Sequence, residues 1–131
     1  MTRNLARRAI AEFTGTLFLL AAVVGSGIMG ERLAAGNTAI ALLANSIATG
    51  AALVAIILAF GPISGAHLNP AVTLARCLTN TFAGIRPRDV VPFIIVQLVG
   101  AVAATLFFNS LSPAHRVSEN RAARSASPTT K

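Results

Sequence analysis

The amino-acid sequence predicts an all-α membrane protein with three transmembrane helices and one re-entrant half-helix. Three apolar runs, at about residues 9–30, 38–60 and 90–108, are each close to the ~20 residues that an α-helix needs to cross a bilayer. Hydrophobic residues make up 54% of the 131 residues and charged residues only 11%, which is typical of integral membrane proteins. A shorter segment at residues 63–79 lies between the second and third runs, and its helical part is too short to span.

The formal net charge of +7 raises the question of a nucleic-acid partner. The positive residues flank the apolar runs and do not form one face of a polar fold, so membrane-flanking arginine is the preferred explanation and we expect no nucleic-acid partner. Cys77 is the only cysteine, which excludes an internal disulfide, and no His/Cys cluster indicates a metal site. Since no nucleophile–base pair is recognisable, we expect no enzyme, no catalytic residue and no cofactor.

Residues 1–8 form a short basic arm before the first span. The apolar run that follows is longer than the ~7–15-residue apolar core of a signal peptide, so we expect it to be retained as a span. Glu12 lies within this run. A carboxylate in an apolar segment marks a functional or paired position by default, but its place four residues after Arg8 also allows a position near the headgroups. The residues alone leave both interpretations open.

The second span is expected to end at Gly61-Pro62, because both residue types terminate helices. Thr49 lies within this span, twenty residues before Asn69. A threonine in a membrane helix often bonds its own helix backbone. It can also turn its hydroxyl toward a channel, and both alternatives remain open.

Asn69-Pro70-Ala71 predicts the start of a helix. Asparagine is a favoured N-cap, and proline suits the first turn because its missing N–H is not needed there. The loop before it, residues 63–68, would be non-helical backbone at membrane depth, which is tolerated only where it is buried in protein or lines water. Gly65 permits a backbone path that other residues resist. A short helix whose N-terminus points at the membrane midplane is how channels build a selective constriction.

The third span includes Pro92, expected in the first helical turn, and Gln97, expected to face other helices. Residues 109–131 change character: apolar periodicity ends, and Ser, Ala and Arg dominate. We interpret them as a disordered basic tail. A solvated tail is preferred to one that binds acidic lipid or nucleic acid.

Three stretches resemble the aquaporin and glycerol-facilitator (major intrinsic protein) family. The sequence Ile-Ser-Gly-Ala-His-Leu-Asn-Pro-Ala-Val-Thr at 63–73 is similar to the family's first signature loop. Residues 11–16 resemble its first helix and residues 97–101 its third. Three matches in the right order are specific, and together they cover residues 9 to about 108. They correspond to a single aquaporin-type repeat, the N-terminal half of the family's usual chain.

The resemblance implies a half-length channel for passive transmembrane transport of water or small neutral solutes such as glycerol. Its NPA motif would shape and polarise the constriction, and the carbonyls of the preceding loop would accept hydrogen bonds along one wall. Carried over residue by residue, the motif is Asn69, Pro70 and Ala71, and the pore-lining loop is Gly65, Ala66 and His67.

The resemblance also assigns roles to three further side chains. Thr49 would take a selectivity position that commonly holds a bulky aromatic residue, so its small size favours glycerol-like or neutral metalloid-hydroxide solutes over strict water selectivity. Glu12 would brace the loop by hydrogen bonding, with His67 as its natural partner. For His67 this bracing role is preferred to proton shuttling.

The family's pore needs two inverted repeats, whereas this sequence contains one. We therefore expect a homo- or hetero-oligomer in the lipid bilayer to complete the pore. The alternative is a truncated, non-conducting half-channel that acts only as a structural or interaction membrane protein. The change of composition near Leu111 would fit a lost reading frame.

The distribution of positive residues bears on orientation. The predicted protein is a multi-pass protein of the plasma (inner) membrane, with its N-terminus in the cytoplasm. Two copies in opposite orientations would need dual topology, which the charges of the tail permit. One side would carry Arg3, Arg7, Arg8, Arg76, Arg86 and Arg88, and the other Arg32, Arg116, Arg121, Arg124 and Lys131.

Overall fold

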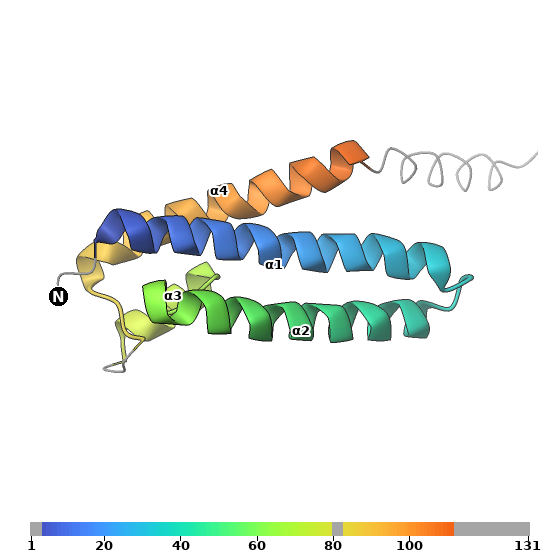
Figure 1. Ribbon diagram of the computed structural model, residues 1–131, viewed down its shortest axis with the longest axis horizontal. Helices are drawn as coiled ribbons and strands as arrows, with labels where there is room; N and C mark the ends of the chain where they lie inside the picture. Colours follow the sequence, from blue (N-terminus) through green and yellow to red (C-terminus); the bar gives the residue numbers. More distant parts are fainter. Residues whose placement is uncertain (1–3, 80–82, 112–131) are drawn as a thin grey trace, which may run out of the picture.

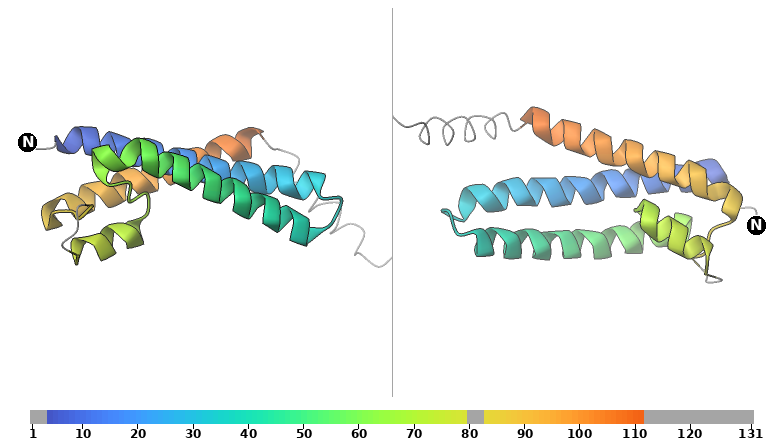
Figure 2. Two further views of the ribbon diagram at one scale, coloured as in Figure 1. Left: turned by 60° about the horizontal axis from the view of Figure 1, so that its bottom comes forward. Right: turned by 180° about the vertical axis from the view of Figure 1, so that it is seen from behind.

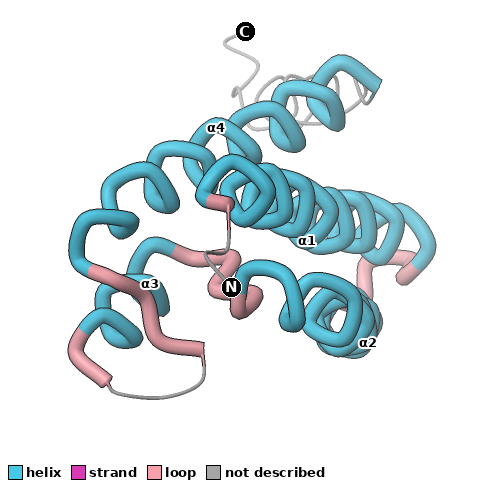
Figure 3. Tube along the Cα trace, turned by 60° about the vertical axis from the view of Figure 1, so that its left-hand side comes forward, coloured by secondary structure: helices cyan, strands magenta, loops and turns pink. Residues whose placement is uncertain are grey.

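The computed structural model describes residues 4–79 and 83–111, and all regular structure in these residues is helical. Figure 1 shows α1 and α2 side by side and antiparallel, with α4 crossing on the other side of α1. The short α3 lies at the end of the bundle where α1 and α4 begin and α2 ends (Figures 2 and 3). The helices are α1 at Leu5–Leu33, α2 at Thr38–Ser64, α3 at Pro70–Cys77 and α4 at Pro87–Leu111.

Helices α1, α2 and α4 are each long and apolar enough to cross a membrane. The 29 residues of α1 extend over about 43 Å at ~1.5 Å per residue, more than the ~30 Å of a bilayer's hydrocarbon core. Large apolar side chains such as Leu42, Leu58 and Leu106 are exposed on the outer faces. The prediction of three spans plus one half-helix is therefore confirmed, and the chain is an integral, multi-pass membrane protein.

Two predicted helix ends are wrong. Helix α2 continues through Pro62 to Ser64 and ends where Gly65 adopts a left-handed φ of 98°. A proline removes one N–H but keeps a helical φ, so the helix ends only where the backbone itself turns. Helix α4 already begins at Pro87, so Pro92 lies inside it and not in its first turn.

The span limits also differ at both ends of the chain. Residues 5–8 of the predicted basic arm are helical, and residues 109–111 of the predicted tail belong to α4. Both extensions mix apolar and polar residues, Leu-Ala-Arg-Arg at 5–8 and Asn-Ser-Leu at 109–111, and the helices continue through them although the hydrophobicity falls. Arg3 and residues 112–131 of the tail lie outside the described residues.

Small residues let α1 approach both of its long neighbours. A Cβ added to Gly100 of α4 would lie 2.7 Å from the carbonyl oxygen of Phe13, and one added to Gly30 would lie 3.0 Å from that of Ala41 in α2. Such backbone approach is how membrane helices gain packing contacts without a hydrophobic driving force between them. Helix α1 is therefore the central element that fixes α2 and α4.

Candidate functional site

The site is the loop that joins α2 to α3. After Gly65 the backbone takes positive φ values at two residues other than glycine, 46° at Ala66 and 57° at Leu68. Such conformations are unfavourable for side chains with a Cβ and persist only where the surroundings enforce them. Ala66, His67 and Leu68 are all buried.

Inward hydrogen bonds enforce this path. The N–H groups of residues 65–68 all donate to acceptors inside the protein. Among the described residues, no hydrogen bond ends on the carbonyl oxygens of residues 65–67, which leaves these as acceptors. The four hydrogen bonds run from the N–H of Gly65 to the Gly61 carbonyl, of Ala66 to Ser64 Oγ, of His67 to Glu12 Oε1 and of Leu68 to Glu12 Oε2.

Glu12 is the centre of this arrangement and is fully buried in α1. Its carboxylate accepts four hydrogen bonds, from Ser64 Oγ at 2.6 Å, the His67 N–H at 3.0 Å, the Leu68 N–H at 2.7 Å and Gln97 Nε2 at 2.8 Å. An ionised carboxylate is acceptor-only, which suits a site made entirely of donors. One side chain thus ties α1 to the end of α2, the loop and α4.

Gln97 has a larger part than the sequence indicated. Besides Glu12, its Nε2 donates to Thr73 Oγ1 of α3 at 2.9 Å, so it joins the half-helix to the same network. The signal in the sequence was a lone amide in an apolar span, which indicates an inward position but does not identify its partner.

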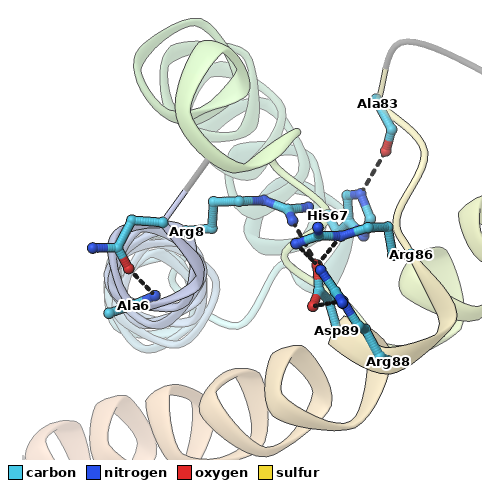
Figure 4. Close-up of polar contacts among 8 residues, drawn as sticks. Ala6, Arg8, His67, Ala83, Arg86, Arg88 and Asp89 are labelled. Atoms are coloured by element: carbon cyan, nitrogen blue, oxygen red, sulfur yellow. Dashed lines mark hydrogen bonds and ion pairs between the residues drawn. The ribbon is translucent and has the colours of Figure 1, made fainter. Parts of the chain in front are cut away.

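The His67 ring has partners other than the expected one. Its Nε2 donates to the Ala83 carbonyl at 2.8 Å (Figure 4), its Nδ1 lies 3.2 Å from Thr73 Oγ1, and it meets Phe93 edge-on. Only its backbone N–H bonds Glu12. Burial lowers the pKa of this histidine, which lies outside the three long helices, so the neutral ring with its proton on Nε2 fits the geometry.

Asn69 caps α3 as the sequence predicts. Its Oδ1 accepts the Ala71 N–H at 2.8 Å, its backbone is extended, and Pro70 takes the first helical position. The side-chain amide Nδ2 forms no hydrogen bond with the described residues. Since Asn69 is exposed, that donor is available at the start of the half-helix.

Thr49 lies on α2 away from the loop and is half-buried. Its Oγ1 donates to Asn45 Oδ1 at 3.0 Å. Asn45 Oδ1 also accepts a hydrogen bond from Ser26 Oγ of α1 at 3.1 Å. The hydroxyl therefore bonds a side chain one turn earlier, which neither sequence-based alternative included. Asn45 was missed because its role depends on α1 lying beside it.

A buried ion pair joins the first turns of α1 and α4 (Figure 4). Arg8 NH1 lies 3.0 Å from Asp89 Oδ2, and the Arg8 guanidinium stacks over the Phe93 ring at 4.8 Å. Arg86 and the exposed Arg88 share the same carboxylate, at 2.9 and 3.8 Å. Arg8 was predicted to belong to a basic cytoplasmic arm, but it is buried in α1, where Asp89 compensates its charge.

No group of three or more His, Cys, Asp and Glu side chains among the described residues is placed to hold a metal ion. Cys77 is a free thiol on α3.

Comparison with known proteins identifies the family. The family described as Major intrinsic protein matches residues 1–131. The chain is 50% identical over 102 residues to Aquaglyceroporin AqpS of Rhizobium meliloti, covering 78% of this chain and 42% of that protein. It is 42% identical over 119 residues to Aquaporin AqpM of Methanothermobacter thermautotrophicus, covering 80% and 47%.

A third relative, Probable aquaporin AqpM of Archaeoglobus fulgidus, is 37% identical over 122 residues, covering 82% of this chain and 48% of that protein. The chain spans about half the length of the curated relatives it matches. No solved structure matches the chain significantly. With a family match over the whole chain and the signature loop folded back against three membrane helices, the chain belongs to the major intrinsic protein family.

Proposed function

We propose that this chain forms one wall of a channel through which water or small uncharged solutes such as glycerol cross the membrane passively. The observation that carries the proposal is the loop at residues 65–68. Its N–H groups all donate inward, and its carbonyl oxygens at 65–67 are left as acceptors. The names of the relatives, aquaporin and aquaglyceroporin, agree with it.

The chemistry of the wall favours uncharged solutes. A solute that loses its water shell needs replacement partners, and hydroxyl groups can both donate to the loop carbonyls and accept from the Asn69 amide. The N-terminal end of α3 carries a positive partial charge because its N–H groups point along the axis. This charge disfavours cations at the constriction. Glu12 and His67 act in the proposal as braces of the loop and take no part in transfer.

Thr49 is proposed as a selectivity residue. Its side chain is small and already bonded to Asn45, so it leaves more space than an aromatic ring would. By size this favours glycerol-like or neutral metalloid-hydroxide solutes over water alone.

The opposite wall has to come from other helices. We propose that a second copy or another chain supplies them within an oligomer in the plasma membrane. The starts of α1 and α4 and the short α3 lie at one end of the bundle (Figure 3). Arg7, Arg76 and Arg88 belong to these segments, and Arg86 directly precedes α4. By the positive-inside rule that end, with the N-terminus, faces the cytoplasm.

Stopped-flow light scattering on proteoliposomes tests the proposal, with water first and glycerol second. Asn69→Asp keeps a favourable N-cap but adds a negative charge at the start of α3. Asn109→Asp makes the same change at an exposed position near the end of α4 and is the matched control. We expect permeation above empty liposomes, a loss of roughly tenfold in Asn69→Asp, and no change in Asn109→Asp.

Well-inserted protein with no permeation would contradict the proposal and favour a purely structural or interaction role. Equal permeation by both variants would contradict the role of Asn69.

A further inference from the structure

Three arginines surround one aspartate where α1 and α4 begin (Figure 4). The carboxylate of Asp89 is buried and is shared by Arg8, Arg86 and Arg88. Glu12, the other acidic residue in the first half of α1, is already occupied by its four donors. The arginine cluster therefore keeps two positive charges in excess.

The arginine cluster also has more donors than acceptors. The Arg8 side chain is only 8% exposed, and its Nε has no hydrogen-bond partner among the described residues. Arg88 Nε lies 3.8 Å from Asp89 Oδ1, which is beyond hydrogen-bond distance. The side chains of Arg86 and Arg88 are 49% and 73% exposed, so both can be reached from outside. An anion with several oxygens would supply the charge and the acceptors that the cluster lacks.

An apolar stripe on α4 begins one turn after Arg88. Its residues recur at intervals of three or four, so they lie on the same face of the helix as Arg88. Each of them is between 53% and 63% exposed, so none of the described segments covers the stripe. The stripe consists of Val91, Ile95, Leu98, Val99, Val102 and Leu106.

The stripe has the length and shape for an acyl chain. Half of the ~30 Å hydrocarbon core corresponds to about ten residues of helix, so a chain whose headgroup lies at Arg88 extends to about Leu98. There the stripe deepens into a shallow groove of about 350 Å³, lined only by apolar residues from Leu98 to Leu106. The basic and apolar parts thus follow each other along one helix face, as headgroup and chain do in a lipid.

We propose that the arginine cluster and the stripe on α4 together bind one anionic phospholipid, with its phosphate at Arg86 and Arg88 and an acyl chain along the stripe. Guanidinium groups bind phosphate oxygens through paired N–H donors, and basic residues at a membrane surface attract anionic headgroups. A free phosphate would use only the cluster, whereas a phospholipid matches both parts. Lipid binding here needs no conduction and is separate from the proposed channel function.

Native mass spectrometry of the detergent-solubilised full chain tests the headgroup site. Palmitoyl-oleoyl phosphatidylglycerol is the anionic probe, and phosphatidylcholine with the same chains is the zwitterionic reference. The double variant Arg86→Gln, Arg88→Gln removes two exposed charges of the cluster, and Arg7→Gln, Arg32→Gln removes two exposed charges of α1 as the matched control. We expect the wild type to prefer phosphatidylglycerol. Its affinity should fall roughly thirtyfold in the cluster variant and stay close to wild type in the control.

A photoreactive phosphatidylglycerol with a diazirine in its acyl chain tests the stripe. Peptide mass spectrometry should place the cross-links on α4 between residues 91 and 102, and the cluster variant should lose them. The exposed apolar side chains of α2, such as Leu42 and Leu58, provide the reference for unspecific labelling. Glycerophosphoglycerol, which is the headgroup without chains, should not displace the lipid at equal concentration.

Each outcome decides the question. Equal binding of the two lipids, or equal losses in the two double variants, overturns the headgroup site. Displacement by glycerophosphoglycerol at equal concentration would make the cluster a site for free anions. Cross-links spread equally over α2 and α4 overturn the role of the stripe. Asp89 keeps Arg8 as its partner in the cluster variant, and circular dichroism checks that the helices form. If they do not, the single variant Arg88→Gln should still lose roughly fivefold in affinity, and no loss would overturn the proposal.

Discussion

Replacing Glu12 should release the loop from the helices. In Glu12→Ala the N–H groups of His67 and Leu68 lose their acceptor, and both lie in buried backbone. The other two donors keep alternatives, because Ser64 Oγ lies 3.4 Å from the Phe60 carbonyl and Gln97 Nε2 still bonds α3. Each unpaired buried donor costs about 1–3 kcal/mol, so two predict a loss of about 2–6 kcal/mol in the free energy of unfolding.

Glu12→Gln keeps the size and shape of the side chain but replaces the carboxylate by a neutral amide. The amide keeps one carbonyl oxygen, so at least one of the two backbone donors faces an NH₂ group and loses its partner. The expected loss is about 1–3 kcal/mol, at the low end because the variant also removes a buried charge.

Unfolding in mixed micelles followed by circular dichroism measures both losses. Hydrogen exchange then locates them, since the amides of residues 67 and 68 should exchange faster while that of Ala66, bound to Ser64, changes less. Arg7→Ala, at an exposed position on the same helix, is the control. If Glu12→Ala stays within about 0.5 kcal/mol of this control, or if exchange at 67 and 68 is unchanged, the bracing role is wrong.

Three further predictions use the same unfolding measurement. Gly100→Ala puts a Cβ 2.7 Å from a backbone oxygen of α1 and should lower the free energy of unfolding by about 1–3 kcal/mol. Gly50→Ala, whose Cβ would have nothing within 4 Å, should not lower it. Equal effects of the two variants would contradict the close approach of α1 and α4. Asp89→Ala leaves a buried guanidinium unpaired and should cost about 3–5 kcal/mol, against less than about 1 kcal/mol for Arg88→Gln at an exposed position. Because burial lowers the pKa of His67, the imidazole binds a proton at higher pH in the unfolded chain than in the folded one. The free energy of unfolding should therefore fall as the pH drops through 6.5 and below. A His67→Gln variant whose stability depends on pH just as steeply would refute this.

The elements that local chemistry determines were predictable. Apolar runs of sufficient length indicate the spans, and the capping oxygen of Asn69 with the fixed φ of Pro70 indicates where α3 begins. Helix ends were less accurate, because the end of α2 depends on a left-handed φ at Gly65 and not on Pro62.

Contacts between distant residues were only partly predictable. That Glu12 has a partner follows from its cost in an apolar run, but its four donors are 52 to 85 residues away, and the helix arrangement selects them. The pairing of Arg8 with Asp89, 81 residues apart, required knowing that α1 and α4 begin at the same end. The backbone donors of the loop carry no sequence signal at all, because every residue except proline has a backbone N–H.

The reach of Glu12 along the chain also has a consequence for how the protein is made. During synthesis α1, α2 and the loop leave the ribosome before α4, so Ser64 and the two loop amides can meet the carboxylate first, and Gln97 only later. Gln97 also bonds Thr73 of α3. The hydrogen bond between Gln97 and Thr73, which ties α3 to α4, therefore forms only after α4 has been synthesised. We expect the loop to stay accessible to the insertion machinery until that moment, and a nascent chain arrested before α4 to have an unfinished site.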